Sequence, residues 1–289
     1  METINRQSLG DKMKSYRKHP GSFLLLLLVL IAAVFTVCVL VFLVSYILIR
    51  GIPYLKPSLF AWEYTSENVS MLPAMVNTLL MTVLALAISI PFGVGAAIYL
   101  VEYAKKGNKL VKMIRVTAET LSGIPSIIYG LFGMLFFVTA LKWGYSMLAG
   151  AMTLAIMVLP VIMRTTEEAL LCVPDSFREG SFGLGAGKLR TIFRIVLPSA
   201  IPGILSGVIL AIGRIVGETA ALIYTSGTVA GVAGVLDSGR TLAIHMYSLS
   251  REGMHSNEAY ATAVVLLVIV LLINGVSSLI ARKFQAPQK

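Results

Sequence analysis

Charged residues are scarce in this chain of 289 residues, where they make up 13% of the sequence. Typical soluble domains contain roughly 25% charged residues. Apolar residues make up 57% of the chain, and its mean hydropathy is +0.84. A water-facing surface is not built from so few charges, so the composition excludes an ordinary cytosolic enzyme. A disordered chain is excluded as well, because disorder needs low hydrophobicity together with high net charge.

Cysteine is also scarce, and the sequence contains no catalytic or metal-binding pattern. Cys38 and Cys172 are too few for a disulfide framework, and we expect both to be reduced packing residues. The three histidines lack the spacing of zinc ligands. The stretch 183–188 resembles a phosphate-binding loop, but Phe182 stands in place of its first glycine and Leu189 in place of its Ser or Thr. We therefore expect no ATP site, metal or cofactor in this chain.

Long apolar runs dominate what is present. A helix needs about 20 apolar residues to cross a hydrocarbon core about 30 Å thick, because each residue adds about 1.5 Å. Six segments meet this requirement: 23–49, 74–101, 120–141, 146–163, 199–224 and 259–281. The first is too long for the core of a signal peptide, so we expect it to be retained. The pattern predicts an all-α membrane protein with six transmembrane helices.

Lys and Arg residues gather on one predicted side of the membrane. Eighteen of the 24 lie in the N-terminal tail, the loops after the second and fourth spans, or the C-terminal tail. The positive-inside rule then places both termini in the cytoplasm, as an even number of spans requires. The predicted organisation is a cytoplasmic tail (1–22), a transmembrane domain (23–281) and a second cytoplasmic tail (282–289). The net charge of +10 therefore indicates no nucleic-acid partner.

The longest predicted external segment is 225–258, which contains several glycines and serines. Two interpretations remain open for it: a re-entrant gate, or a simple connection outside the membrane. No internal repeat is apparent in the chain, so the sequence gives no support to a secondary transporter built from inverted repeats.

The predicted cytoplasmic loop after the fourth span resembles the EAA loop of ABC importer permeases, whose pattern is E-A-A-x3-G-x9-I-x-L-P. Five positions match at the pattern's spacing: Glu179, Gly185, Ile195, Leu197 and Pro198. Gly180 and Ser181 replace two alanines with other small residues. A glycine at 185 allows a turn between two short helical pieces, and Pro198 suits the first turn of the next span.

This resemblance implies a type I ABC importer permease whose coupling loop, 174–198, inserts into a separate ATPase. Two further segments, 121–132 and 213–222, resemble segments of phosphate importer permeases, and the chain as a whole is similar to the PstA-type subunit. The resemblance implies a PstC-type permease partner, two PstB-type ATPase subunits that bind ATP and magnesium, and an external PstS-type phosphate-binding protein. Membrane lipid would surround the assembly in the cell membrane.

Arg214 and Glu218 are charges inside the predicted fifth span, at positions i and i+4 of one helix face. Each costs about 2.5 kcal/mol or more to insert, so such residues usually line a pathway or pair with one another. Our interpretation is that Arg214 faces the translocation path and offers its planar donors to phosphate, while Glu218 holds Arg214 between passages. The alternative is a structural ion pair to a neighbouring helix. Arg164, at the predicted cytoplasmic end of the fourth span, is either a second pathway residue or a positive-inside anchor.

The sequence thus predicts a permease subunit that imports inorganic phosphate at the expense of ATP hydrolysed elsewhere. Three alternatives stay open. The first is a permease for another oxyanion such as molybdate or sulfate. The second is an ion-coupled secondary carrier, and the third is a membrane-embedded enzyme, which the missing catalytic constellation disfavours.

Overall fold

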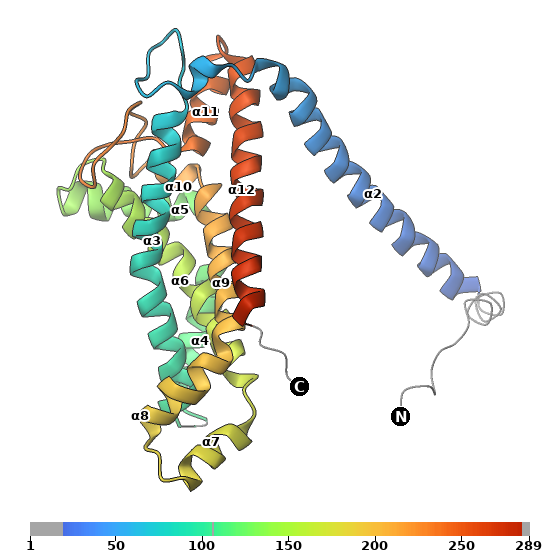
Figure 1. Cartoon of the computed structure of the whole chain (residues 1–289), viewed down its shortest axis with the longest axis vertical. Coiled ribbons are helices and arrows are strands. Elements are labelled where there is room, and N and C mark those ends of the chain that lie inside the picture. The colour runs from blue at the N-terminus through green and yellow to red at the C-terminus, as the bar shows by residue number, and fades with distance from the viewer. Residues whose placement is uncertain (1–19, 106, 285–289) are drawn as a thin grey trace. The chain divides into compact units, whose positions relative to one another are not determined.

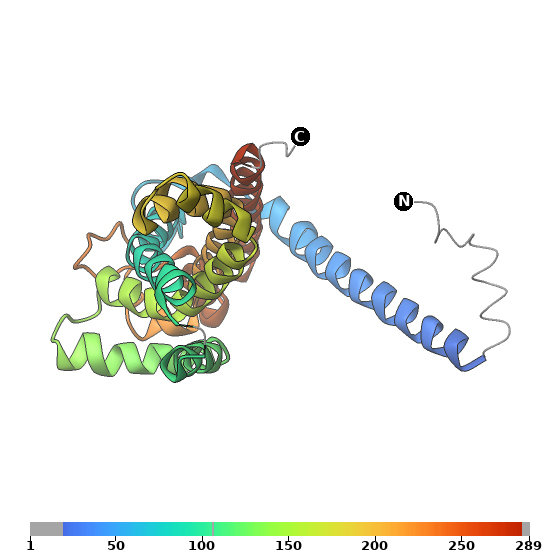
Figure 2. The ribbon, with the colours of Figure 1, turned by 90° about the horizontal axis from the view of Figure 1, so that it is seen from below.

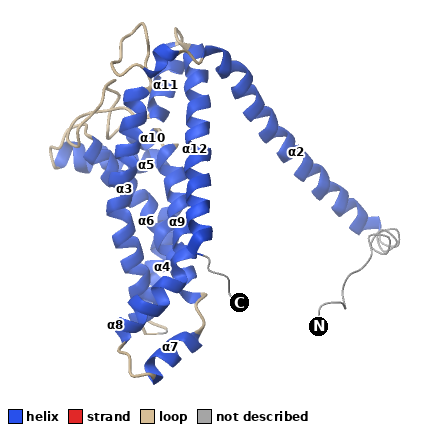
Figure 3. Cartoon of the chain, in the orientation of Figure 1, coloured by secondary structure: helices blue, strands red, loops and turns tan. Residues whose placement is uncertain are grey.

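The computed structural model describes residues 20–105 and 107–284, and within them it is built from helices and loops without strands (Figures 1 and 3). The chain divides into two compact units, the first ending at Arg50 and the second beginning at Gly51. Most of the predicted tails, 1–22 and 282–289, lies outside the described residues.

The first unit contributes one long helix, α2 (Pro20–Gly51), which carries no charged residue before Arg50. Its apolar side chains are exposed on all sides of the helix, as expected for a helix that faces lipid. Cys38 on this helix and Cys172 in the second unit are both free, as expected, but both are exposed in the chain by itself.

The second unit is a helical bundle. Its longer helices are α3 (Leu72–Ile98), α4 (Lys109–Ser122), α6 (Met147–Leu171), α9 (Leu197–Val216), α11 (Leu242–Glu252) and α12 (Ser256–Phe284). Its shorter elements are η1 (Ile52–Tyr54), η2 (Pro57–Phe60), η3 (Tyr99–Tyr103), α5 (Ser126–Gly133), η4 (Met134–Ala140), α7 (Asp175–Gly183), α8 (Lys188–Thr191), η5 (Ile192–Val196) and α10 (Ala220–Ile223). Helices α7 and α8 lie at one end of the bundle, and α11 lies towards the other (Figure 1).

Among the described residues, five helices are long and apolar enough to cross a membrane. In the second unit they are Leu72–Tyr103, Met147–Leu171, Lys188–Val216 and Ser256–Leu279, and α2 is the fifth. A bent pair, Lys109–Ser122 with Ser126–Ala140, brings the number to six if it counts as one span. The predicted all-α membrane fold is confirmed in this form.

The predicted third span, 120–141, is wrong as a single helix. Helices α4 and α5 meet at 101°, and Figure 2 shows the α5–η4 segment crossing the end of α4. The break falls at Gly123, Ile124 and Pro125. Proline disfavours the helical conformation of the residue before it, and here Pro125 itself is extended, with ψ 140°. Much of the basic loop predicted after the second span is therefore helical, because α4 begins at Lys109.

Two predicted helix ends also differ from the structure. Helix α6 continues past 163 to Leu171, so Arg164 lies inside it rather than at its end. The fifth span begins at Lys188, before the predicted 199, and ends at Val216 rather than 224. Its π-helical turn η5 lies directly before α9, close to Pro198. In a regular helix the ring of Pro198 would clash with the carbonyl of Arg194, and the wider turn accommodates it.

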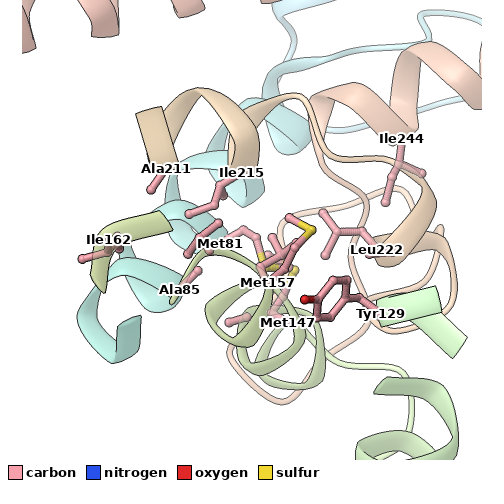
Figure 4. Close-up of a cluster of buried hydrophobic side chains, with 14 of the residues drawn as sticks. Met81, Ala85, Tyr129, Met147, Met157, Ile162, Ala211, Ile215, Leu222 and Ile244 are labelled. Atoms are coloured by element: carbon pink, nitrogen blue, oxygen red, sulfur yellow. The ribbon is translucent and has the colours of Figure 1, made fainter. Parts of the chain in front are cut away.

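The main core lies where α6 packs against α3 and α9. Figure 4 shows Met81 of α3 and Met157 of α6 in one buried cluster with Leu222 and Tyr129. Small residues allow close approach: a Cβ on Gly130 of α5 would lie 2.7 Å from the Cα of Ala221 in α10. The hydroxyl of Tyr129 donates to the carbonyl of Leu121 at 2.7 Å, which joins the two arms of the bent pair.

The segment 225–258 forms a loop followed by α11, and the side chain of Asn77 in α3 holds the loop. The Asn77 amide nitrogen donates to the carbonyls of Gly231 at 2.7 Å and Arg240 at 3.2 Å. Its oxygen accepts from the amide of Ala233 at 2.9 Å. The loop also covers the N-terminus of α6, where the amide of Leu148 donates to the carbonyl of Val235 at 2.8 Å. The segment is thus closely bound to the bundle.

A buried polar cluster lies at the start of α11. The Arg240 guanidinium lies 4.4 Å from the ring centre of Tyr64, and the His245 ring meets the same ring edge-on at 6.2 Å. Burial, with the charge of Arg240, lowers the pKa of His245 from 6.5 to about 3, and the backbone of Val69 opposes this shift weakly. His245 is therefore neutral at physiological pH.

Candidate functional site

The loop predicted to couple to an ATPase is held at the end of the bundle as a helix–turn–helix. Helix α7 follows Pro174, ends at Gly183, and is separated from α8 by a turn at Gly185. Gly185 has φ +82°, a left-handed conformation that favours glycine, and nothing lies within 4 Å of where its Cβ would be. The turn expected there is present. Glycine is favoured at position 185 by the backbone conformation and not by a lack of space for a side chain.

One side of this segment faces solvent. Glu179 is exposed on α7, and the apolar side chains of Phe177, Phe182 and Leu184 are exposed beside it, Leu184 to 91%. Among the described residues, Glu179 takes part in no ion pair. We call these four residues the docking surface. An exposed apolar group of this kind is typical of a protein-binding site.

The last three residues of the motif are not in the loop. Ile195 belongs to η5, and Leu197 and Pro198 open α9, so all three lie within the continuous helix Lys188–Val216. Ile195 and Leu197 are half-buried. These residues therefore connect the docking surface to the fifth span without a break in the helix.

A clamp of hydrogen bonds fixes the opposite side of α7 to the bundle. Arg178 donates from Nη2 to Glu102 Oε1 at 2.8 Å and from Nε to the same oxygen at 3.1 Å. It also donates to the carbonyls of Leu170 at 2.9 Å and Val173 at 2.7 Å, which lie at the C-terminus of α6. A cation at this position satisfies carbonyls that have no partner within the helix.

Arg214 and Glu218 do not share a helix face, so that prediction is wrong. Helix α9 ends at Val216, with Gly217 as its C-cap, and Glu218 follows the helix end. The Glu218 carboxylate instead accepts from the backbone amide of Ala221 at 3.1 Å, at the start of α10. None of the ion pairs in the described part of the chain includes Arg214 or Glu218. Glu218 is buried and Arg214 is half-buried in the last turn of α9.

Arg164 opens onto a cavity of about 480 Å³ between α4 and α6. Its guanidinium lies 3.2 Å from Glu168 on its own helix and 3.8 Å from Glu119 on α4, and its side chain is 61% exposed. A second pair, Arg115 with Glu167, crosses the same gap at 2.5 Å. The cavity lining does not include Arg214 or Glu218, so the structure does not gather the three predicted pathway residues into one site.

A match to a known protein family shows which class of protein carries this site. Residues 89–286 match the family model described as the inner membrane component of binding-protein-dependent transport systems. The chain belongs to this family. The matched residues include all of 174–198, which we call the coupling segment, together with Arg164, Arg214 and Glu218. The protein is thus a multi-pass permease subunit of an ABC importer, and ATP hydrolysis belongs to a separate subunit.

Related sequences support a narrower class. The permease is 31% identical to the phosphate transport system permease protein PstA of Yersinia pestis, over 98% of this chain and 99% of that protein. It is 34% identical to PstA 1 of Mycobacterium tuberculosis (strain CDC 1551 / Oshkosh), over 72% of this chain and 69% of that one. It is 34% identical to the probable ABC transporter permease protein YqgI of Bacillus subtilis (strain 168), over 84% and 89%.

Solved structures show the same fold at low sequence identity. A chain of a bacterial ABC transporter involved in the import of the acidic polysaccharide alginate superposes with a TM-score of 0.69 at 16% identity, over 94% of this permease and all of that chain. A chain of the MetNI methionine ABC transporter in an inward-facing conformation gives 0.59 at 21% identity, over 74% of this permease and 94% of that chain. The predicted fold class is therefore confirmed.

Sequence reasoning missed several residues that this permease places at the site. Arg115 and Glu119 join Arg164 at the cavity, although they lie in what the sequence presents as a basic loop. Arg178 and Glu102 are 76 residues apart, and no motif relates them. The sequence offered only a general indication of these ion pairs. Opposite charges occur on two segments that the positive-inside rule places on one side of the membrane.

Proposed function

We propose that this permease subunit conducts inorganic phosphate into the cell as the PstA-type half of a heterodimeric pathway. The observation that carries this proposal is the similarity to PstA of Yersinia pestis, which extends over 98% of this chain and 99% of that protein. A match of this extent involves the spans and the coupling segment together, rather than the shared coupling motif alone.

The proposed partners follow from this role. A PstC-type permease completes the pathway, two PstB-type subunits bind ATP and magnesium, and a PstS-type protein delivers phosphate from outside. The chain itself then needs no cofactor. With α7 and α8 in the cytoplasm to meet the ATPase, both termini are cytoplasmic, and the loop held by Asn77 is external. Lipid covers the apolar surface that the partner permease leaves free.

Arg214 is the proposed pathway residue with the strongest physical case. It is half-buried inside a span, and no carboxylate in the described residues forms an ion pair with it. A guanidinium in this state carries a permanent charge and planar donors that match phosphate oxygens. Glu218 accepts a hydrogen bond from the start of α10, so its contribution is to position that short helix. Arg164 would serve the inner part of the pathway, where an entering anion competes with Glu119 and Glu168 for its guanidinium.

The docking surface is the proposed contact with the ATPase, with Glu179 at its centre. Glu179→Lys reverses an exposed charge that supports no contact within the described fold, so folding and membrane insertion are expected to persist while ATPase binding weakens. Co-purification of the ATPase with the permease measures this, and Glu179→Gln is the milder comparison. Normal ATPase binding and uptake in Glu179→Lys would show that the docking assignment is wrong.

The proposed substrate is tested in cells. Deletion of this chain is expected to abolish high-affinity phosphate uptake and to leave sulfate and molybdate uptake unchanged, and the wild-type chain is expected to restore it. If sulfate or molybdate uptake is lost instead, the permease serves that oxyanion. If uptake persists after the ATPase is inactivated, the protein behaves as a secondary carrier and the proposal is contradicted.

A further inference from the structure

A single guanidinium joins three parts of the permease that are distant in sequence. Arg178 belongs to α7, its Nη1 and Nη2 groups reach carbonyls at the C-terminus of α6, and Nη2 and Nε reach Glu102 in η3. The side chains are only 14% and 9% exposed for Arg178 and Glu102. Because water screens this pair little, the attraction between its two charges is stronger than in the exposed pair that Arg164 makes with Glu168.

The contacts divide α7 into two faces. Arg178 and Ser181, which are three residues apart, face the permease, and the Ser181 hydroxyl lies 2.8 Å from the hydroxyl of Thr191 in α8. Glu179, Phe177 and Phe182 are exposed. The same short helix thus carries residues of the docking surface on one face and Arg178 on the other. Because the helix is short, a displacement of its exposed face also displaces Arg178.

The clamp reaches a span that is not adjacent to α7 along the chain. Through the backbone, α7 continues into α6 on one side and into α8, η5 and α9 on the other. Glu102 instead lies in η3, the π-helical end of α3, and π-helical turns are frequent at functional positions. A second contact reaches the same turn, since Lys188 Nζ lies 4.8 Å from the ring centre of Tyr103.

We propose that Arg178 and Glu102 transmit displacement of the coupling segment to α3, so that α3, α6 and α9 move together when the ATPase closes. This rests on the proposed ATP-driven import. Both residues are positioning residues, which contact neither ATP nor the transported anion. Without the pair, the coupling segment still moves α6 and α9 through the backbone, but α3 follows only through the contact of Lys188 with Tyr103 and through side-chain packing.

The test is made with the complete transporter in proteoliposomes, with two quantities measured in one sample: anion taken up and ATP hydrolysed. Glu102→Gln keeps the size and hydrogen-bonding oxygen of the side chain but removes its charge. We expect an assembled complex whose hydrolysis is still stimulated by the loaded binding protein, with anion uptake per ATP lowered about fivefold. Glu102→Asp keeps the charge on a shorter side chain and is expected to give an intermediate ratio.

Asp175→Asn is the matched control. Asp175 contacts the same guanidinium at 3.2 Å, but it is 85% exposed, lies on α7 itself and is not in the docking surface. Its loss is expected to leave the ratio at the wild-type value. A wild-type ratio in assembled Glu102→Gln would overturn the proposal, as would failure of both Glu102 variants to assemble, because the pair would then only hold the fold together. A wild-type transporter without ATP-driven uptake would overturn the proposed function as well.

Discussion

The side-chain oxygen of Asn77 accepts a hydrogen bond from the amide of Ala233 at 2.9 Å, across 156 residues of sequence. With its two donated bonds to Gly231 and Arg240, this one buried side chain holds the loop after α10 against α3. Neither end of the relationship carries a recognisable motif. It nevertheless binds the loop between α10 and α11 to the bundle.

The first prediction concerns this side chain. Asn77→Ala leaves two carbonyls and one amide without partners in a buried place and is expected to cost about 3 kcal/mol of stability. The effect should be local. Compared with the wild type, hydrogen exchange should be faster in residues 229–240 and unchanged in α6, as measured by mass spectrometry of the purified protein. Asn68→Ala, which removes a half-buried asparagine from a turn outside this contact, is the comparison. Unchanged exchange in the loop would show that the Asn77 bonds do not hold it.

The second prediction concerns close packing at Gly130. A Cβ there would lie 2.7 Å from the Cα of Ala221, a backbone atom that cannot rotate away. Gly130→Ala is expected to lower stability by about 1–3 kcal/mol. Gly95→Ala in α3 meets nothing within 4 Å and should stabilise its helix by about 0.5–1 kcal/mol. Thermal unfolding in detergent measures both. Equal midpoints for the two variants would contradict the packing of α5 on α10.

The third prediction is a pH dependence of stability from His245. Its pKa is lowered to about 3 in the folded chain, while the unfolded value is 6.5, so below pH 6.5 the unfolded state binds the extra proton. Stability is therefore complete above pH 6.5 and falls by about 1.4 kcal/mol per pH unit as the pH drops towards 3. His245→Leu removes this contribution. The unfolding midpoints of wild type and variant should diverge between pH 6.5 and 4.5, and parallel curves would contradict the buried, neutral histidine.

How far these features were predictable depended on whether they are local in sequence. The apolar runs predicted where α2, α3, α6 and α12 would lie, because crossing a membrane imposes length and composition on each segment by itself. The Gly185 turn was predictable for the same reason, since a left-handed residue is a local requirement.

Features that depend on partners distant in sequence were not predictable. The spacing of Arg214 and Glu218 indicated one helix face only on the assumption that the helix continued beyond Val216. Glu218 instead follows the helix end and accepts a hydrogen bond from the amide of Ala221. The bend at Pro125 could not be predicted from the proline alone, since Pro91 and Pro160 lie inside α3 and α6 without ending them. The clamp between Arg178 and Glu102 joins segments that only the fold brings together.

The fourth prediction separates the two interpretations of Arg214. Arg214→Ala is expected to lower phosphate uptake about tenfold or more, through loss of charge-assisted hydrogen bonds to the anion. Complex assembly and ATPase binding should persist. Arg214→Lys keeps the charge without the planar fork and should recover part of the uptake. Normal uptake in Arg214→Ala at wild-type expression would leave Arg214 with a structural role only.

The most direct test of the central claim is phosphate uptake by the complete transporter in proteoliposomes, with this chain, its permease partner, the ATPase and the binding protein all present. The account predicts uptake of radiolabelled phosphate that requires ATP inside the cytoplasmic compartment, ceases when this chain is omitted, and is not competed by sulfate or molybdate. Uptake that proceeds without ATP, or that prefers another oxyanion to phosphate, would contradict it.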